Sequence, residues 1–253
     1  MDNQIYKKII SKKEFSYLPE RDVELAFERF ERRQVSDEEK VRLARDLLHR
    51  VFASFVSSKI LSPKEKDTEW ILRKHISTRE RLDFYKKVYE RIFKNFKEKN
   101  VIDLGCGING FSYNYFPRKI NYFGVESVGQ LVDLQNSYFD KDNISGKIFH
   151  KSLFDLDNVE KIINKIKGEK IIFLFKVVDC LEMIQKDYSK KLLERIVPLA
   201  DRVVISFATR SLVSRKKFKV NRKWFFDFID ENFNIIDDFE IGTERYIIIS
   251  KKK

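Results

Sequence analysis

Apolar residues follow two different spacings along this chain and divide it into two parts. In residues 22–96 they recur every three to four positions, which is the spacing of helices that bury one face. Ser36 followed by Glu39, and Ser77 followed by Glu80, are each typical of a capping box at a helix start. The first part is therefore predicted to be all-helical.

Past residue 100 the apolar residues gather in short runs rich in Val and Ile. The runs cover residues 101–104, 122–125, 147–150, 171–175, 202–207, 234–241 and 245–250. Strands that alternate with helical spacers predict a parallel sheet covered on both faces, and the closely spaced last two runs predict a hairpin. We expect an α/β fold with a Rossmann-like seven-stranded sheet, an architecture that fold analogy links to methyltransferases dependent on S-adenosylmethionine (SAM). The expected domains are 1–95 and 96–253.

Composition narrows the possible partners. The 253 residues include 51 Lys and Arg against 39 Asp and Glu, a net charge of +12, which favours a polyanion such as nucleic acid over a membrane surface. The apolar runs are too short to span a bilayer, and the N-terminus does not have the pattern of a signal peptide. Two isolated Cys and three scattered His predict no metal site. We expect a cytoplasmic monomer with no membrane partner.

The most chemically informative segment follows the first predicted strand. Gly105, Gly107 and Gly110 satisfy G-x-G-x-x-G, the pattern of a tight turn that lets the backbone approach a cofactor. Glu126, at the end of the second strand, suits a ribose with both hydroxyls free, which NAD and SAM share. Asp103 inside the turn would repel a pyrophosphate but attract the cationic groups of SAM, so the sequence favours SAM.

Two residues after the third predicted strand extend this cofactor site. Phe154 and Asp155 lie where such folds contact adenine. An equally good interpretation is that Asp155 caps the helix predicted from Val159 onward.

Four further segments carry a family resemblance. They are HISTRERL from His75, LFKVV from Leu174, ISFATRSL from Ile205, and the pair Trp224-Phe225. In order and spacing they resemble motifs of the aminoglycoside-resistance 16S rRNA methyltransferases, which modify N7 of a guanine in the ribosomal decoding site. The resemblance covers roughly residues 70–250, and the helical first part resembles that family's rRNA-docking domain.

The resemblance implies roles for several of these residues. Arg81 would hold the methionine carboxylate of SAM, a task that suits its fork of donors, and His75 and Thr78 would also bind the cofactor. Lys176, which interrupts an apolar strand end, would serve both cofactor binding and catalysis; a snorkelling lysine is its alternative. The chain departs from the family at Asp179 and Ala208, where Pro is usual, and at Arg210, where Lys is usual.

Methyl transfer to guanine N7 needs positioning of the base and no general base, because N7 has a lone pair and no proton to lose. A flipped base needs an apolar or aromatic surface. Phe207 is the candidate, with a core Phe as the equal alternative, and Trp224 is a weaker one. Arg210 completes the predicted catalytic set with Lys176 and Phe207.

An acid-free basic segment follows the fifth predicted strand. Its cations are Arg210, Arg215, Lys216, Lys217, Lys219, Arg222 and Lys223. The position beside the expected cofactor site suits a grip on phosphates flanking a target base, with a solvated loop as the alternative.

The sequence thus predicts a SAM-dependent methyltransferase acting on guanine N7 in 16S rRNA of the small ribosomal subunit. The alternatives are a methyltransferase for another RNA site, such as adenine N1 of the same helix or a tRNA base, and a non-catalytic RNA-binding or ribosome-assembly factor.

Overall fold

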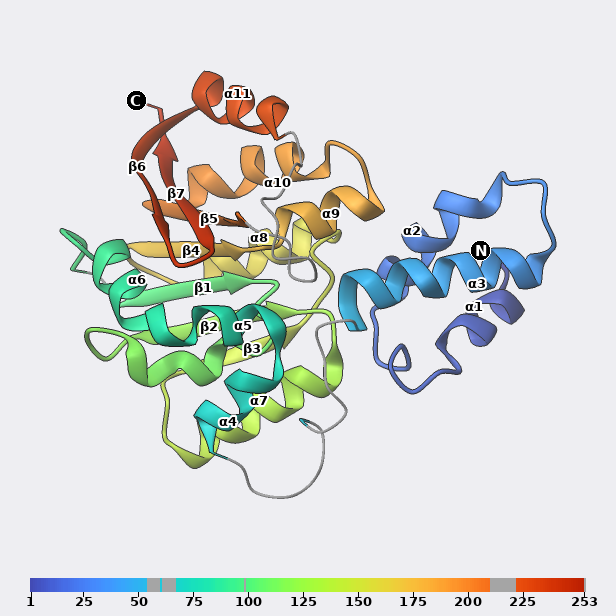
Figure 1. Cartoon of the computed structure of the whole chain (residues 1–253), viewed down its shortest axis with the longest axis horizontal. Coiled ribbons are helices and arrows are strands. Elements are labelled where there is room, and N and C mark those ends of the chain that lie inside the picture. The colour runs from blue at the N-terminus through green and yellow to red at the C-terminus, as the bar shows by residue number, and fades with distance from the viewer. Residues whose placement is uncertain (54–59, 61–66, 98, 210–221, 253) are drawn as a thin grey trace.

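The computed structural model describes residues 1–53, 60, 67–97, 99–209 and 222–252 (Figure 1). Within them, seven strands form one sheet in the order β3-β2-β1-β4-β5-β7-β6. The strands are β1 (Asn100–Leu104), β2 (Asn121–Glu126), β3 (Gly146–His150), β4 (Lys170–Phe175), β5 (Arg202–Ala208), β6 (Phe233–Ile241) and β7 (Glu244–Lys251). Strand β7 pairs antiparallel with β5 and β6, and the other neighbouring strands are parallel. The predicted strands, the hairpin and the fold class are confirmed.

Helices precede the sheet and connect its strands. In the described segments the α-helices are α1 (Asn3–Ile10), α2 (Glu20–Glu31), α3 (Asp37–Leu48), α4 (Thr68–Lys74), α5 (Ile76–Arg81), α6 (Tyr85–Ile92), α7 (Gly129–Lys141), α8 (Leu156–Lys165), α9 (Val178–Ile184), α10 (Tyr188–Ile196) and α11 (Lys223–Asn232). Short helical turns are η1 (His49–Ala53), η2 (Leu82–Phe84), η3 (Asn109–Tyr115) and η4 (Val197–Leu199). This order places a helical segment after each of the parallel strands β1 to β5, as the alternation of runs predicts, and only β6 and β7 follow each other directly.

Successive residues of the central strands enter two different cores. In β4, Ile171 and Phe173 pack with residues of α4–α7, whereas Ile172 and Leu174 pack with residues of α8–α11. Side chains of a strand alternate between the faces of a sheet, so a strand covered on both faces is apolar throughout. This explains why the central strands appear in the sequence as continuous apolar runs.

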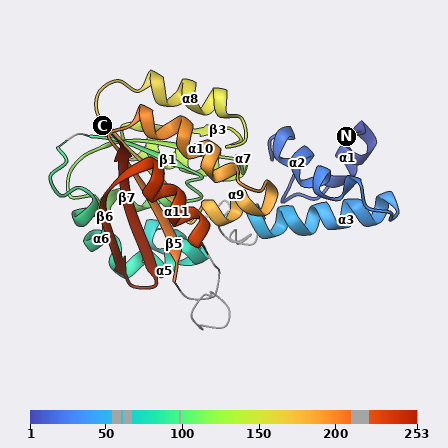
Figure 2. The ribbon, with the colours of Figure 1, turned by 90° about the horizontal axis from the view of Figure 1, so that it is seen from above.

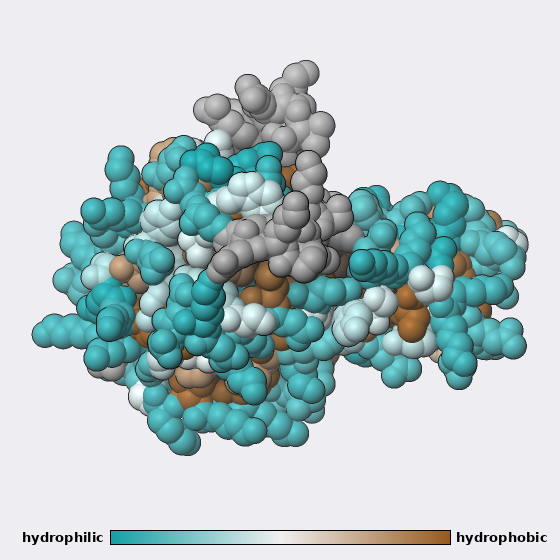
Figure 3. All heavy atoms as spheres, turned by 90° about the horizontal axis from the view of Figure 1, so that it is seen from below, coloured by the Kyte–Doolittle hydropathy of each residue, from teal (hydrophilic) through white to brown (hydrophobic). Residues whose placement is uncertain are grey.

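Helices α1–α3 form a lobe beside the body that contains the sheet, and Figure 2 shows the same separation from above. The lobe adjoins the body where α2 contacts α9. Helices α4 and α6 contact η3 and therefore pack with the body, although they precede the expected domain boundary at residue 95. Seen from below, the described residues of both parts present a mostly hydrophilic surface, with smaller hydrophobic groups (Figure 3).

The two predicted capping boxes have different outcomes. Ser36 is the N-cap of α3, and its Oγ accepts from the backbone N–H of Glu39 at 3.3 Å, as predicted. The second prediction is wrong, because α5 begins at Ile76 after His75 and Ser77 lies inside the helix. Glu80 instead reaches a cation from another part of the chain.

None of the helices in the described ranges combines the length and the apolar character required to cross a bilayer.

Candidate functional site

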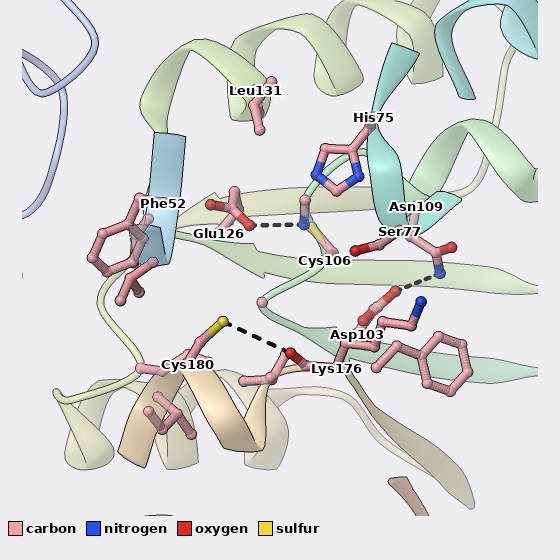
Figure 4. A pocket seen from close by; sticks show the side chains of 18 of the residues that line it. Phe52, His75, Ser77, Asp103, Cys106, Asn109, Glu126, Leu131, Lys176 and Cys180 are labelled. Atoms are coloured by element: carbon pink, nitrogen blue, oxygen red, sulfur yellow. Dashed lines mark hydrogen bonds between the residues drawn. The ribbon is translucent and has the colours of Figure 1, made fainter. Parts of the chain in front are cut away.

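A cavity opens at the carboxyl ends of the parallel strands (Figure 4). Its lining comes from β1 and the turn after it, the end of β2, the residues after β4, and α5. Phe52 of η1 also lines it, so the N-terminal part contributes to the same cavity. Open α/β sheets bind their ligands at this edge, where strand order reverses; here β1 lies between β2 and β4.

The turn after β1 requires glycine at two positions. Gly105 and Gly107 have φ of +72° and +54°, in the left-handed region that costs other residues energy. A Cβ on Gly105 would lie 2.8 Å from Val177 Cγ2, and one on Gly107 would lie 3.4 Å from His75 Nε2. The sequence prediction of a tight, closely approached turn is therefore consistent with the geometry.

Asp103 is a buried acid with one oxygen in use and one free. Its Oδ2 accepts from Tyr122 Oη at 2.6 Å and from Asn109 Nδ2 at 2.7 Å. Its Oδ1 is buried and has no hydrogen-bond partner among the described residues. Burial raises the pKa of Asp103 to about 6, against the lowering effect of those two hydrogen bonds and of Arg81. An unmet carboxylate oxygen beside a cavity suits a cationic or hydrogen-bonding ligand.

Glu126 is held in place by the backbone. Its Oε2 accepts from the N–H of Gly107 at 2.8 Å, and its Oε1 accepts from the N–H of Val128 at 2.9 Å. Burial raises the pKa of Glu126, and the same backbone bonds lower it. The two backbone donors orient the carboxylate before any ligand arrives. Each oxygen retains a lone pair that can accept from a ligand.

The two acids fit the donor groups of SAM. Asp103, through its unmet Oδ1, would face the amino group of the methionine part, and Glu126 would accept from the ribose hydroxyls. When bound, SAM supplies an electrophilic methyl group on a sulfonium. The chain would supply an acidic wall that could hold such a cation-bearing molecule in one orientation.

Arg81 lies in a buried hydrogen-bond network rather than alone in the cavity. Its guanidinium donates to Glu244, with Nη2 to Oε1 at 2.7 Å, and its Nη1 donates to Asn109 Oδ1 at 3.2 Å. It also lies over the ring of Phe175, 4.6 Å from the centroid. The predicted contact of Arg81 with a methionine carboxylate remains a prediction, and Asn109 connects this arginine to Asp103.

Lys176 emerges from the end of β4 in the left-handed region, with φ of +59°. Its Nζ lies 2.7 Å from Glu80 Oε2 and 3.4 Å from Glu244 Oε2. Although burial raises the pKa of Glu244, Arg81 and Lys176 together hold it below its usual value. Arg81, Lys176, Glu80 and Glu244 are the charge network of this site: two cations and two anions whose charges balance.

His75 and Thr78 hold the α4–α5 corner against the cavity. The hydroxyl of Thr78 donates to the carbonyl of Leu72 at 2.6 Å. Burial, Arg81 and Lys176 lower the pKa of His75 to about 3, which keeps its imidazole neutral. Both residues line the cavity, so the structure brings them together with Arg81 and Lys176.

The residues after β3 divide between cavity and helix. Phe154 lines the cavity. Asp155 is the N-cap of α8, where its Oδ1 accepts from the N–H of Asn158 at 3.3 Å, and it is not part of the cavity lining. The helix-cap interpretation of Asp155 is thus the one that the geometry favours.

Phe207 differs from its expected role as a stacking surface. Only 2% of the residue is exposed, and its ring packs edge-on against Phe225 and Phe226. In this conformation it is a core residue, because rings from α11 cover it. Trp224 packs partly buried against the same core.

Most of the predicted phosphate grip lies outside the described residues, namely Arg210, Arg215, Lys216, Lys217 and Lys219. The two described members already have partners. Arg222 Nη2 lies 2.6 Å from Asp179 Oδ2, and Lys223 Nζ lies 2.7 Å from Asp227 Oδ2. The family departure at Asp179 therefore provides an anion for Arg222, one of the cations of the basic segment.

Sequence reasoning missed four polar residues of the cavity region. Asn109 sits inside the glycine pattern and Glu80 inside a motif quoted for its arginine, so local signals existed for both. Glu244 follows the hairpin turn, and Asp22 lies in the first turn of α2 yet lines the cavity. No local pattern distinguishes these last two from ordinary surface acids.

Comparison with known proteins adds independent findings. A family model described as "Ribosomal RNA methyltransferase (FmrO)" matches residues 65–249. The chain is 28% identical over 228 residues to the "16S rRNA (guanine(1405)-N(7))-methyltransferase" of Serratia marcescens, covering 87% of this chain and 86% of that protein. These matches confirm the resemblance predicted from the sequence.

Solved structures share the fold across the whole length. The 16S rRNA methylase RmtB superposes with a TM-score of 0.79 at 23% identity, covering 99% of this chain and 98% of that one. The 16S rRNA methyltransferase RmtF, solved with S-adenosyl-L-homocysteine, has a TM-score of 0.79 at 20% identity, with 100% of both chains covered. The likeness therefore includes the helical N-terminal part as well as the sheet.

Proposed function

We propose that this chain, which belongs to the ribosomal RNA methyltransferase (FmrO) family, methylates N7 of a guanine in the decoding-site helix of 16S rRNA. Family membership confirms the sequence prediction of a SAM-dependent methyltransferase. The guanine target is supported by the relative in Serratia marcescens, whose name specifies guanine N7 of 16S rRNA.

The observation that carries the proposal is the buried Asp103 with its unmet Oδ1 at the glycine turn. A bare carboxylate oxygen in an apolar setting is costly unless a ligand meets it, and the ammonium group of SAM does so. Glu126, fixed by two backbone N–H groups, completes an acidic wall for a cation-bearing donor.

The chemistry of the site fits a target atom with no proton to lose. His75 is the one histidine that lines the cavity among the described residues, and its pKa of about 3 makes it a poor proton acceptor. Guanine N7 attacks through an in-plane lone pair, so the reaction needs alignment with the methyl group and no base. The cavity side chains would act by holding the two reactants in line.

Binding of the rRNA is proposed for two basic regions. The helical first part, residues 1–95, would dock on the small subunit, and residues 209–223 would grip phosphates near the target base. The net charge of +12 supports a polyanionic partner.

The target is tested by incubating purified protein and SAM with small ribosomal subunits and mapping the product by mass spectrometry. We expect one 7-methylguanine in the decoding-site helix. Methylation at adenine N1, at another nucleotide or in tRNA would replace the proposed target, and absence of methylation together with absence of SAM binding would favour a non-catalytic RNA-binding factor.

The phosphate grip is tested with charge reversal of Arg215, Lys216 and Lys217. We expect unchanged SAM affinity and loss of methylation of the subunits. The matched control is reversal of three other lysines, Lys161, Lys165 and Lys167, which are exposed in and after α8. Equal turnover of the two triple variants would show that the basic segment does not hold the substrate.

A further inference from the structure

One acid of the N-terminal lobe is buried beside the cofactor cavity. Asp22, in α2, has no exposed surface and lines the same cavity as Glu126 and Asp103. Its Oδ1 accepts from Ser152 Oγ at 2.6 Å, whereas its Oδ2 is buried with no hydrogen-bond partner in the part of the chain that the structure describes. Among the described residues, no Lys or Arg forms an ion pair with it. The free oxygen is therefore an acceptor that the folded chain alone does not satisfy.

The contacts of Asp22 place it near the edge formed by β2 and β3. Ser152 follows β3 by two residues, and Ser127, which also lines the cavity, follows Glu126 at the end of β2. Phe154, two residues beyond Ser152, lines the cavity as well. The acid thus lies on the side of the cavity where the adenosine half of SAM is expected, away from the charge network around Lys176.

The lobe is held at this edge by contacts of the segment that precedes Asp22. Gly129 N–H donates to the carbonyl of Tyr17 at 3.4 Å, and Gln130 Nε2 donates to the carbonyl of Lys13 at 3.2 Å. A Cβ on Gly129 would lie 3.0 Å from Tyr17 Cβ, so the two parts meet closely. The position of Asp22 against the cavity is therefore fixed by the start of α7 as well as by Ser152.

A purely structural contact does not account for this arrangement. Burying a carboxylate next to another acid, Glu126, is unfavourable, and burial raises the pKa of Asp22 although Ser152, Ser127 and His150 lower it. The hydrogen bond from Ser152 satisfies Oδ1 only. An asparagine or a serine could accept from Ser152 at lower cost. A charged acceptor facing a cavity is explained when a ligand donates to it.

We propose that Asp22 is a cofactor-binding residue that the N-terminal lobe adds to the catalytic cavity, where its Oδ2 accepts a hydrogen bond from the adenosine half of SAM. The donor is either the adenine amine or a ribose hydroxyl, since both are neutral donors that a carboxylate accepts. The inference rests on the SAM dependence within the proposed function, and it is independent of the rRNA nucleotide that is methylated.

The discriminating variant is Asp22→Asn, measured by calorimetry with S-adenosylhomocysteine and no RNA. Asparagine keeps the shape of the side chain, and its amide oxygen can still accept from Ser152. Its amide nitrogen takes the place of Oδ2, where it donates and cannot accept. We expect affinity to fall about tenfold or more, the effect of losing a hydrogen bond to a charged group. The matched control is Glu28→Gln, which removes the same charge from an exposed position of α2 and should leave affinity unchanged.

A second variant separates ligand binding from lobe attachment. Ser152→Ala removes the hydroxyl that Asp22 accepts from and leaves Oδ2 in place. We expect its loss of affinity to be smaller than that of Asp22→Asn. Unchanged affinity in Asp22→Asn, or equal losses in the two variants, would overturn the proposal, because the carboxylate would then act only through the contact between the parts.

Two ligand analogues identify the donor. One carries a dimethylated adenine amine and the other lacks the ribose 2′-hydroxyl. Wild-type protein should bind one of them more weakly than S-adenosylhomocysteine, and Asp22→Asn should bind that analogue and the parent ligand with similar affinity. If Asp22→Asn discriminates against both analogues as strongly as wild type does, the proposal is wrong. Because no RNA is present, an error in the rRNA target leaves these results unaffected.

Discussion

Carboxylates on the two sides of the cavity are held by different kinds of partner. On the side of β1 and β2, Asp103 and Glu126 are held by neutral donors and keep free acceptor capacity. On the side of β4 and β7, the charge network pairs every cation with an anion. The first side is stabilised when a ligand brings donors and positive charge. On the second side the charges are already balanced by residues of the chain.

The largest expected effect comes from removing one anion of the charge network on the side of β4 and β7. Glu244→Gln would leave Arg81 and Lys176 buried with only Glu80 as an anion. Removing one partner of a buried ion pair typically costs about 3–5 kcal/mol in the free energy of unfolding. Urea unfolding should show a loss of this size.

The control for that variant lies on the same hairpin. Asp238 pairs with Arg245 at 2.6 Å, but both side chains are more than a third exposed. Asp238→Asn should cost about 1 kcal/mol or less, because surface pairs are screened by solvent. Equal losses for the two variants would mean that the buried network adds nothing to stability.

On the side of β1 and β2, removing an acid should change ligand affinity rather than the free energy of unfolding. Asp103→Asn keeps an acceptor for Tyr122 but removes the charge beside the unmet oxygen. We expect the affinity for SAM, measured by calorimetry, to fall about ten- to a hundredfold, the usual range for one charge-assisted hydrogen bond. The free energy of unfolding of the ligand-free protein should not fall, since the variant relieves a desolvated charge. Normal affinity would contradict the assignment of this acid to the cofactor.

Acid pH should distinguish the two sides without any substitution. The pKa of Asp103 and that of Asp22 are both raised to about 6, chiefly by burial. A ligand that needs the ionised acids should bind fully above about pH 7 and weaken as pH falls through 6, by up to about one log unit per pH unit for each acid. His75, with a pKa of about 3, does not titrate in this window. Calorimetry at several pH values checks the profile, and flat affinity from pH 5 to 8 would contradict it.

The same raised pKa values have the opposite consequence for the fold without ligand. An acid whose pKa is higher in the folded state binds more protons there than in the unfolded chain. Between about pH 4 and 6 these two acids therefore reduce the free energy of unfolding as pH rises. As pH rises toward the pKa of these acids, this contribution to stability falls, whereas ligand affinity increases.

The sequence predicted the parts of the site that depend on neighbours in the chain. The strands were predicted to within about one residue, because apolar runs and turn residues are local signals. The sequence likewise predicted that Asp103, Gly105, Gly107 and Glu126 lie together, because they stand at the ends of successive strands, and their contacts with the cofactor remain predictions.

The sequence did not predict contacts between distant segments. Arg81 meets Glu244 across 163 positions and Lys176 meets Glu80 across 96, pairings set by the packing of α5 and β7 on the sheet. Phe207 was equally suited to a core or a stacking role until α11 was seen to cover it. Asp22 resembles any acid in the first turn of a helix, and only the docking of the lobe reveals its burial.

The smallest expected effect comes from removing one neutral donor to Asp103, the hydroxyl of Tyr122. Tyr122→Phe removes the hydroxyl that donates to Asp103 Oδ2 at 2.6 Å, a bond that favours the ionised acid. The pKa of Asp103 should then rise further, because burial still opposes ionisation. We expect the midpoint of the pH profile for SAM binding to move up by about one unit, while affinity at pH 8 stays within about threefold.

Tyr138→Phe is the control. The hydroxyl of Tyr138 is buried without a hydrogen-bond partner among the described residues, so its removal should leave the midpoint in place. A midpoint that moves equally in both variants would show that it reports general loosening of the fold, whereas a shift confined to Tyr122→Phe would identify Asp103 as the titrating group.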